Sequence, residues 1–157
     1  QEWSGKGASV GLLLTLAVTP LRRLPGWNEL IRLRRLLGTF AFFLATLHLF
    51  TYLVFDQSLS VAMIRKDLME HPWVAAGFAA WVLMVPLAVT STAGMVRRLG
   101  GKRWQRLHQL VYLAAAGGVF HFLWLVKKDA TTPERCGLAL VALLLMRLPA
   151  WASRARA

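Results

Sequence analysis

The stretch that decides the fold is LLGTFAFFLATLHLFTYLVF, residues 36–55, which runs for twenty residues without a charge. A helix needs about 20 mostly apolar residues to cross a bilayer, so this stretch is long enough to span one. Four further apolar stretches approach or reach that length, at residues 7–21, 73–92, 107–126 and 133–148. The sequence therefore predicts an all-α, polytopic transmembrane helix bundle with about five spans, forming one domain over residues 1–157.

The overall composition excludes a soluble domain. Hydrophobic residues make up 57% of the 157 residues and charged residues 17%, whereas soluble chains are roughly 45–50% apolar and about 25% charged. The net charge of +12 does not indicate a nucleic-acid-binding protein, because the basic residues lie between long uncharged runs. A single cysteine, Cys136, excludes disulfides and multi-cysteine metal sites.

The connections between the predicted spans differ in charge, and the difference predicts an orientation. One set carries thirteen basic residues and one acid, Glu29; its members lie at 22–35, 93–106 and 147–156. In the opposite set, six basic residues are balanced by six acids. By the positive-inside rule the first set is cytoplasmic, which predicts an inner-membrane protein with residue 1 on the periplasmic side and the C-terminus inside.

Two histidines lie deep inside predicted spans, where ionisable groups usually have a function. His48 is seven residues from the outer end of its span and His121 five from the outer end of its own, depths of roughly 10 and 8 Å. The helices are antiparallel, so both imidazoles lie at a similar depth and could reach one haem iron from opposite faces. Small residues share their helix faces (Ala41, Ala45 and Gly38; Ala114, Gly117 and Gly118) and predict either a slot for a flat ligand or close helix packing.

His108 lies thirteen residues before His121, about 20 Å along a helix, which suits a second redox centre. On a straight helix the two side chains would point about 140° apart, so this interpretation needs a bend or tilt. No histidine on the second span matches His108; Arg34 and Arg35 occupy that level instead. An interfacial histidine in a basic loop is an equally good interpretation of His108, and His71 is more simply an interfacial polar residue.

Three blocks of sequence resemble a known family. The strings LLLTLAVTPLRRL, RLRRLLGTFAFFLATLHLFTYLVFD and VTSTAGMVRRLGGKRWQRLHQLVYLAAAGGVFHFLWLVKKD are similar to the MsrQ or YedZ family, within the ferric-reductase-like transmembrane group. The family supplies the haem-binding membrane subunit of the bacterial periplasmic methionine sulfoxide reductase system. Its intramembrane histidines match His48, His108 and His121. The family has six helices, and the first has no counterpart here, so we expect a further span ahead of residue 1.

The resemblance implies an electron-transfer subunit that is not itself the methionine sulfoxide reductase. It implies one or two b-type haems, with flavin mononucleotide as a further cofactor. It also implies electrons from the quinone pool or a flavin reductase, and a periplasmic molybdopterin partner. We expect an outer haem on His48 and His121 and an inner haem or flavin near His108, with its acidic groups bound by Arg34, Arg35 and Arg106. A ferric or quinone reductase, and a non-redox transporter or structural subunit, remain alternatives.

Overall fold

Helices account for almost all of the chain that the structure describes. The computed structural model describes residues 2–21, 30–125 and 131–146, and the regular elements within those ranges are helices. The predicted all-α fold is therefore confirmed. Its longer helices are α1 (Glu2–Leu21), α2 (Leu30–Thr51), α4 (Pro72–Val89), α7 (Leu110–Leu125) and α8 (Thr131–Leu145).

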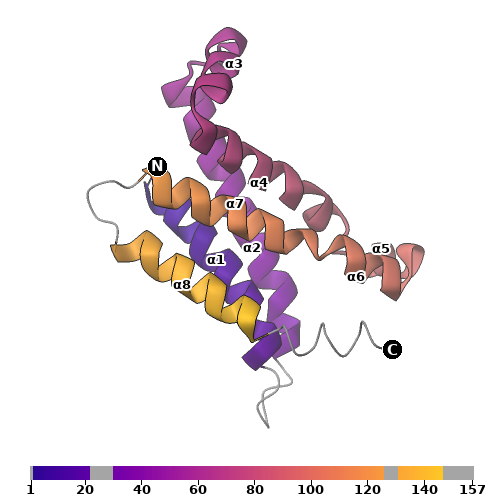
Figure 1. The fold of residues 1–157 in the computed structure, drawn as a ribbon. Helices are drawn as coiled ribbons and strands as arrows, with labels where there is room; N and C mark the ends of the chain where they lie inside the picture. The colour runs from indigo at the N-terminus through magenta and orange to yellow at the C-terminus, as the bar shows by residue number, and fades with distance from the viewer. Residues whose placement is uncertain (1, 22–29, 126–130, 147–157) are drawn as a thin grey trace.

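These helices form a bundle built from two closely packed pairs, α1 with α2 and α4 with α7 (Figure 1). The pairs meet through contacts of α2 with α4 and of α1 with α7, and α8 packs on α1 and α7. The shared core is apolar and includes Leu16 and Ala41 from the first pair and Met84, Ala114 and Phe122 from the second.

Small residues explain the close packing of α1 on α2. Gly7 and Gly11 lie one turn apart on α1, and a Cβ on Gly11 would come within 3.0 Å of the Cβ of Ala41. One turn further on, Thr15 faces Gly38. Small residues spaced by four positions let transmembrane helices approach closely. Ala41 and Gly38 therefore pack against α1, in agreement with the helix-packing interpretation of these residues.

Within the described residues, three helical stretches are long and apolar enough to cross a membrane, judged by length and composition: Leu33–Asp56, Pro72–Val89 and Gly101–Leu125. They correspond to the predicted spans at 36–55, 73–92 and 107–126. The predicted span at 7–21 lies within the 20-residue helix α1. The predicted span at 133–148 overlaps the 15-residue helix α8, and its last two residues lie outside the described residues.

Departures from straight α-helix lie close to His48 and at His108. Four residues after His48, the second span ends in a π-helical segment, η1 (Tyr52–Asp56). The fourth span is interrupted at His108 and Gln109, between α6 (Gly101–Leu107) and α7. The spacing in the sequence called for a bend or tilt between His108 and His121, and the helix is interrupted at the first of these residues.

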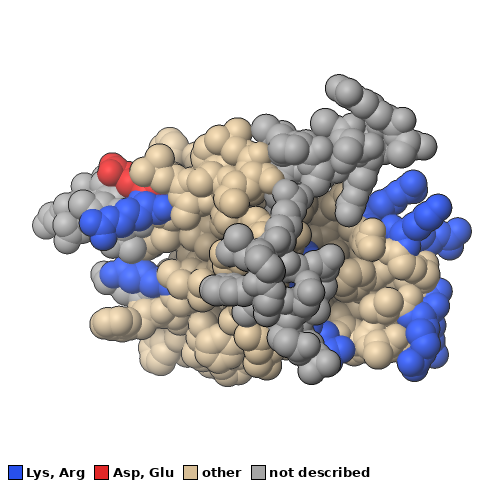
Figure 2. Space-filling view, turned by 90° about the horizontal axis from the view of Figure 1, so that it is seen from below, with Lys and Arg blue, Asp and Glu red and all other residues tan. Residues whose placement is uncertain are grey.

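The connections between spans are also helical. The connection at 56–72 contains α3 (Val61–Glu70), which projects beyond the bundle at one end. At the opposite end α5 (Ala93–Leu99) and α6 carry a cluster of exposed basic side chains, which lie together on the right of Figure 2. Its members are Arg97, Arg98, Lys102, Arg103 and Arg106.

The long sides of the bundle are apolar, as a membrane-spanning bundle requires. On α2, Phe40, Phe43, Leu47 and Phe50 are 43–60% exposed and follow one another at spacings of three and four residues, so they form a stripe on its outward face. Part of the excess of hydrophobic residues noted in the composition therefore faces outward from the bundle.

Candidate haem site

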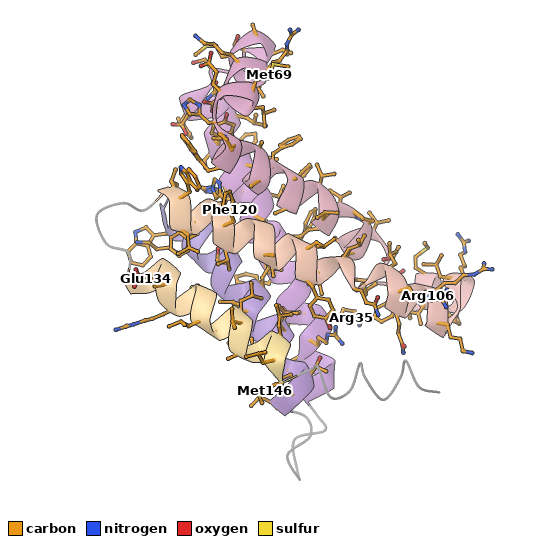
Figure 3. All side chains as sticks on the ribbon, viewed as in Figure 1. Arg35, Met69, Arg106, Phe120, Glu134 and Met146 are labelled. Atoms are coloured by element: carbon orange, nitrogen blue, oxygen red, sulfur yellow. The ribbon has the colours of Figure 1, made fainter. Side chains whose placement is uncertain are left out.

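The structure brings His48 and His121 together inside the bundle. His48 is on α2 and His121 on α7, and their ring centroids are 6.2 Å apart with ring planes at 70°. Both side chains are half-buried. Phe120, which precedes His121, lies toward the end of the bundle that carries α3, where Met69 is labelled in Figure 3. The similar depth estimated from the helical rise thus corresponds to a direct pairing of the two rings.

A backbone carbonyl sets the orientation of the His121 ring. Nδ1 of His121 lies 2.7 Å from the carbonyl oxygen of Trp73, in the first turn of α4. A carbonyl only accepts, so Nδ1 carries the hydrogen and Nε2 carries the lone pair. Histidine ligands of metals usually donate their second N–H in this way, which fixes the ring and raises its basicity. His121 is therefore prepared to bind a metal through Nε2.

Two glycines make room for the imidazole rings. A Cβ on Gly77, one turn after Trp73 on α4, would lie 2.8 Å from Nδ1 of His121. A Cβ on Gly5 of α1 would lie 3.2 Å from Cε1 of His48. Ser4, the neighbour of Gly5, places its hydroxyl oxygen 3.4 Å from Nδ1 of His48. Each ring therefore lies against a glycine of a helix other than its own.

The separation of the rings fits two axial ligands of one iron. Imidazole nitrogens bind transition metals at about 2.0–2.1 Å and lie about 1.1 Å from the ring centre, so two rings on one metal have centroids roughly 6.3 Å apart. Two imidazoles joined by a direct hydrogen bond of about 2.9 Å would have centroids roughly 5 Å apart. The observed 6.2 Å matches the first arrangement. With the free Nε2 of His121, the residues present fit a haem iron.

Hydrogen bonding and stacking tie α4 to α2 beside this pair. The indole Nε1 of Trp81 donates to the hydroxyl of Thr46 at 3.0 Å, and the Trp81 ring stacks on Phe42. Thr46 lies two residues before His48. This contact fixes α2 against the helix that supplies Trp73 and Gly77, and so helps to hold the two rings in register.

Gly117 does not line a slot beside His121. A Cβ there would lie 3.3 Å from the Ala76 carbonyl oxygen and from the Cβ of Ala80, so Gly117 allows α7 to pack on α4. Gly118 faces more open space, because a Cβ there would meet nothing within 4 Å. It lines a narrow gap between α1 and α7 that is too small to hold a water molecule, with Leu12 and Ala115 among the other lining residues.

His108 lies in a separate cluster, at the junction between α6 and α7. Its ring stacks on Trp104, with centroids 3.9 Å apart, and its Nε2 is 3.0 Å from the hydroxyl oxygen of Thr90. The Thr90 hydroxyl donates to the Pro86 carbonyl at 2.6 Å, so it accepts from Nε2 of His108. In this arrangement Nε2 of His108 is already engaged, in contrast to that of His121.

The three arginines predicted at the inner centre differ in their relation to His108. Arg34 is half-buried and lies close enough to His108 for its charge to act on the ring. Arg35 and Arg106 are exposed, and both lie toward the end of the bundle opposite α3 (Figure 3). The charge of Arg34 therefore acts on His108, whereas Arg35 and Arg106 lie at the surface.

Several residues of these clusters were not identified from the sequence. The sequence pattern did not single out Trp73, whose backbone carbonyl accepts a hydrogen bond from His121. Gly5, Gly77 and Thr90 were not singled out at all. A glycine near the end of a span indicates only weakly that another group packs closely against it. The helix packing shows that this group is the imidazole of His48 for Gly5 and of His121 for Gly77.

Comparison with known proteins identifies similar chains. The family of ferric reductase like transmembrane components matches residues 6–119. The "Protein-methionine-sulfoxide reductase heme-binding subunit MsrQ" of Herminiimonas arsenicoxydans is 53% identical over 148 residues, covering 92% of this chain and 68% of that protein. Proteins of the same name from Ralstonia nicotianae and Rhodospirillum rubrum are both 48% identical. They cover 94% and 92% of this chain, and 68% and 69% of their own lengths.

Proposed function

We propose, because the chain belongs to the MsrQ family of ferric reductase like transmembrane proteins, that it is a membrane electron-transfer subunit. It binds b-type haem and passes electrons to a partner that reduces methionine sulfoxide in proteins. The observation that carries this proposal is the pairing of His48 and His121, with ring centroids 6.2 Å apart. The relatives are named as haem-binding subunits of a methionine sulfoxide reductase, which supports the same cofactor and partner.

In this function the chain itself supplies ligands, orientation and a dry environment. His48 and His121 would hold the iron of the outer haem. Trp73 accepts the Nδ1 hydrogen of His121 and keeps Nε2 available. The apolar core around Phe122 and Ala114 keeps water from the pair and lowers the local dielectric. Bound haem supplies a reversible one-electron couple.

A second centre near His108 completes the path across the membrane. His108 lies within electrostatic range of Arg34, and Arg35 and Arg106 are exposed at the end of the bundle opposite α3 (Figure 3). Guanidinium groups bind propionates and phosphates, so this cluster suits either a second haem or flavin mononucleotide. A haem there requires the Thr90 hydroxyl to release Nε2 of His108, or ligation through Nδ1.

The charge asymmetry supports an orientation for this path. The basic α5 and α6 face the cytoplasm and α3 the periplasm, so the chain lies in the bacterial inner membrane with residue 1 outside and the C-terminus inside. Electrons enter from the quinone pool or a cytoplasmic flavin reductase. They leave on the α3 side to a periplasmic, molybdopterin-containing catalytic subunit. By position, its docking surface consists of the outer connections at 56–72 and 127–135, of which residues 127–130 lie outside the described residues.

A visible absorption spectrum of the purified full chain tests the proposal most directly. We expect a Soret band whose intensity per protein gives one or two haems. A colourless protein would contradict the proposal and favour a non-redox transporter or structural subunit.

The electron acceptor needs its own experiment. With the protein reduced, the rate of reduction of the purified partner subunit is compared with that of a free ferric chelate. Preference for the protein partner is expected, whereas preference for the chelate would favour a small-molecule ferric reductase. Supplying reduced quinone or reduced flavin in turn identifies the donor.

A further inference from the structure

A carboxylate outside the candidate haem site links the end of α2 to the start of α4. Asp67, on α3, accepts hydrogen bonds from three side chains: the Tyr52 hydroxyl on η1, Nε2 of Gln57 at 3.1 Å, and Nδ1 of His71 at 2.6 Å. Gln57 is buried and the other three residues are half-buried. We call these four residues the Asp67 network.

One end of the Asp67 network fixes the helix that carries His48. Tyr52 lies four residues after His48, in the π-helical continuation of α2. A π-helix is a rare and weakly stable geometry, and the chain then turns through Ser58 and Leu59, which both have positive φ. Local structure alone therefore defines this end of α2 poorly, and the hydrogen bond from Tyr52 to Asp67 anchors it to α3.

The other end of the Asp67 network fixes the turn that holds His121. His71 ends α3 and caps α4, and its carbonyl accepts from the backbone N–H groups of Val74 and Ala75. Its side chain is held by Asp67, and its own N–H donates to the Asp67 carbonyl at 2.9 Å. Trp73, whose carbonyl accepts from His121, is two residues further on.

We propose that Asp67 is a positioning residue for the bis-histidine pair. Its carboxylate holds the end of the helix that carries His48 and the turn of α4 whose Trp73 carbonyl accepts from His121 at a fixed separation, without itself touching the two histidines. This inference rests on the proposed haem function and goes beyond it by assigning a role to the helix α3. Replacing a residue that positions a metal ligand typically lowers the metal affinity about 10- to 100-fold.

Matched variants of the full-length, haem-loaded chain test this role. Asp67→Asn keeps the side-chain volume but has one acceptor oxygen in place of two, and its new N–H donors face other donors. Glu70→Gln removes the same charge from the same helix, but Glu70 is exposed and contacts only Lys66 among the interactions described, at 3.9 Å. Tyr52→Phe removes a single hydrogen bond of the Asp67 network and leaves the acid in place.

Two readouts report position independently of enzymatic activity. The electron paramagnetic resonance spectrum of low-spin ferric haem depends on the relative orientation of its axial imidazoles, and transfer to a haem-scavenging protein gives the rate of haem loss. For Asp67→Asn we expect a shifted spectrum and about tenfold faster haem loss, the lower end of that range. Tyr52→Phe should give a smaller change in the same direction and Glu70→Gln none.

The outcomes separate this inference from the proposed function. A wild-type chain without a Soret band would overturn both. A haem-bearing wild type, with Asp67→Asn and Tyr52→Phe indistinguishable from it, would overturn the positioning role alone. Equal shifts in Asp67→Asn and Glu70→Gln would also overturn it, because they would show an effect of charge. If Asp67→Asn fails to fold, Tyr52→Phe decides between these outcomes.

Discussion

The carbonyl oxygen of Trp73 accepts a hydrogen bond from Nδ1 of His121 at 2.7 Å, so the first turn of α4 fixes the imidazole of α7. This contact determines which ring nitrogen carries the lone pair, because a carbonyl cannot donate. It also makes the metal-binding ability of His121 depend on a helix that contributes no ligand of its own. The predictions below follow from this dependence and from the separate environment of His108.

Replacing either His48 or His121 by alanine should remove the haem that the pair holds. Each variant loses one axial ligand, so we expect at least about a tenfold fall in Soret absorbance per protein. Added imidazole should restore part of the absorbance, because it fits the space left by the side chain. His108→Ala is the control and should keep the spectrum of the pair. A normal bis-histidine spectrum in both single variants would rule out this ligand assignment.

Gly77→Ala should disturb His121 without changing a polar group. The new Cβ would lie 2.8 Å from Nδ1, so the ring must move or lose its bond to Trp73. Overpacking of this kind typically costs about 1–3 kcal/mol. Haem titration and thermal unfolding in detergent should show weaker binding and lower stability. Gly118→Ala adds the same methyl group where nothing lies within 4 Å, and an equal loss in that variant would contradict the explanation.

His108→Ala should affect only the second centre. We expect the haem held by His48 and His121 to remain, and the second haem or the flavin to be lost. Thr90→Val keeps the shape of the threonine but leaves Nε2–H of His108 without its acceptor, which costs about 1–3 kcal/mol if the ring stays buried. The haem-to-protein ratio and the flavin fluorescence released on denaturation measure both effects. Unchanged cofactor content in His108→Ala would show that the cluster is structural.

The proposed orientation can be checked with single cysteines. Cys136 is buried and is replaced by alanine to give a cysteine-free background. A cysteine at Met69, which is 73% exposed on α3, should react with a membrane-impermeant thiol reagent in cells with a permeabilised outer membrane. A cysteine at the exposed Arg98 should react only after the inner membrane is opened. The reverse pattern would invert the topology.

The sequence could predict the helices, because each depends on the length and apolar character of one continuous segment. Residues 36–55 identify a membrane span without any knowledge of its neighbours. The rise per residue then placed His48 and His121 at similar depth, and the structure brings their rings together. The same arithmetic called for a bend or tilt between His108 and His121, and the helix is interrupted at His108.

Sequence by itself thus determined the fold class and the two histidines that pair, since both follow from distances measured along single helices. Only the tertiary structure decided how the rings are held. Trp73 and Gly77 reach His121 from α4, Gly5 reaches His48 from α1, and Asp67 links α3 to both sides of the site. These contacts join residues 43 to 48 positions apart in the chain at His48 and His121. They depend on how helices cross and rotate against one another, which no pattern within one segment records.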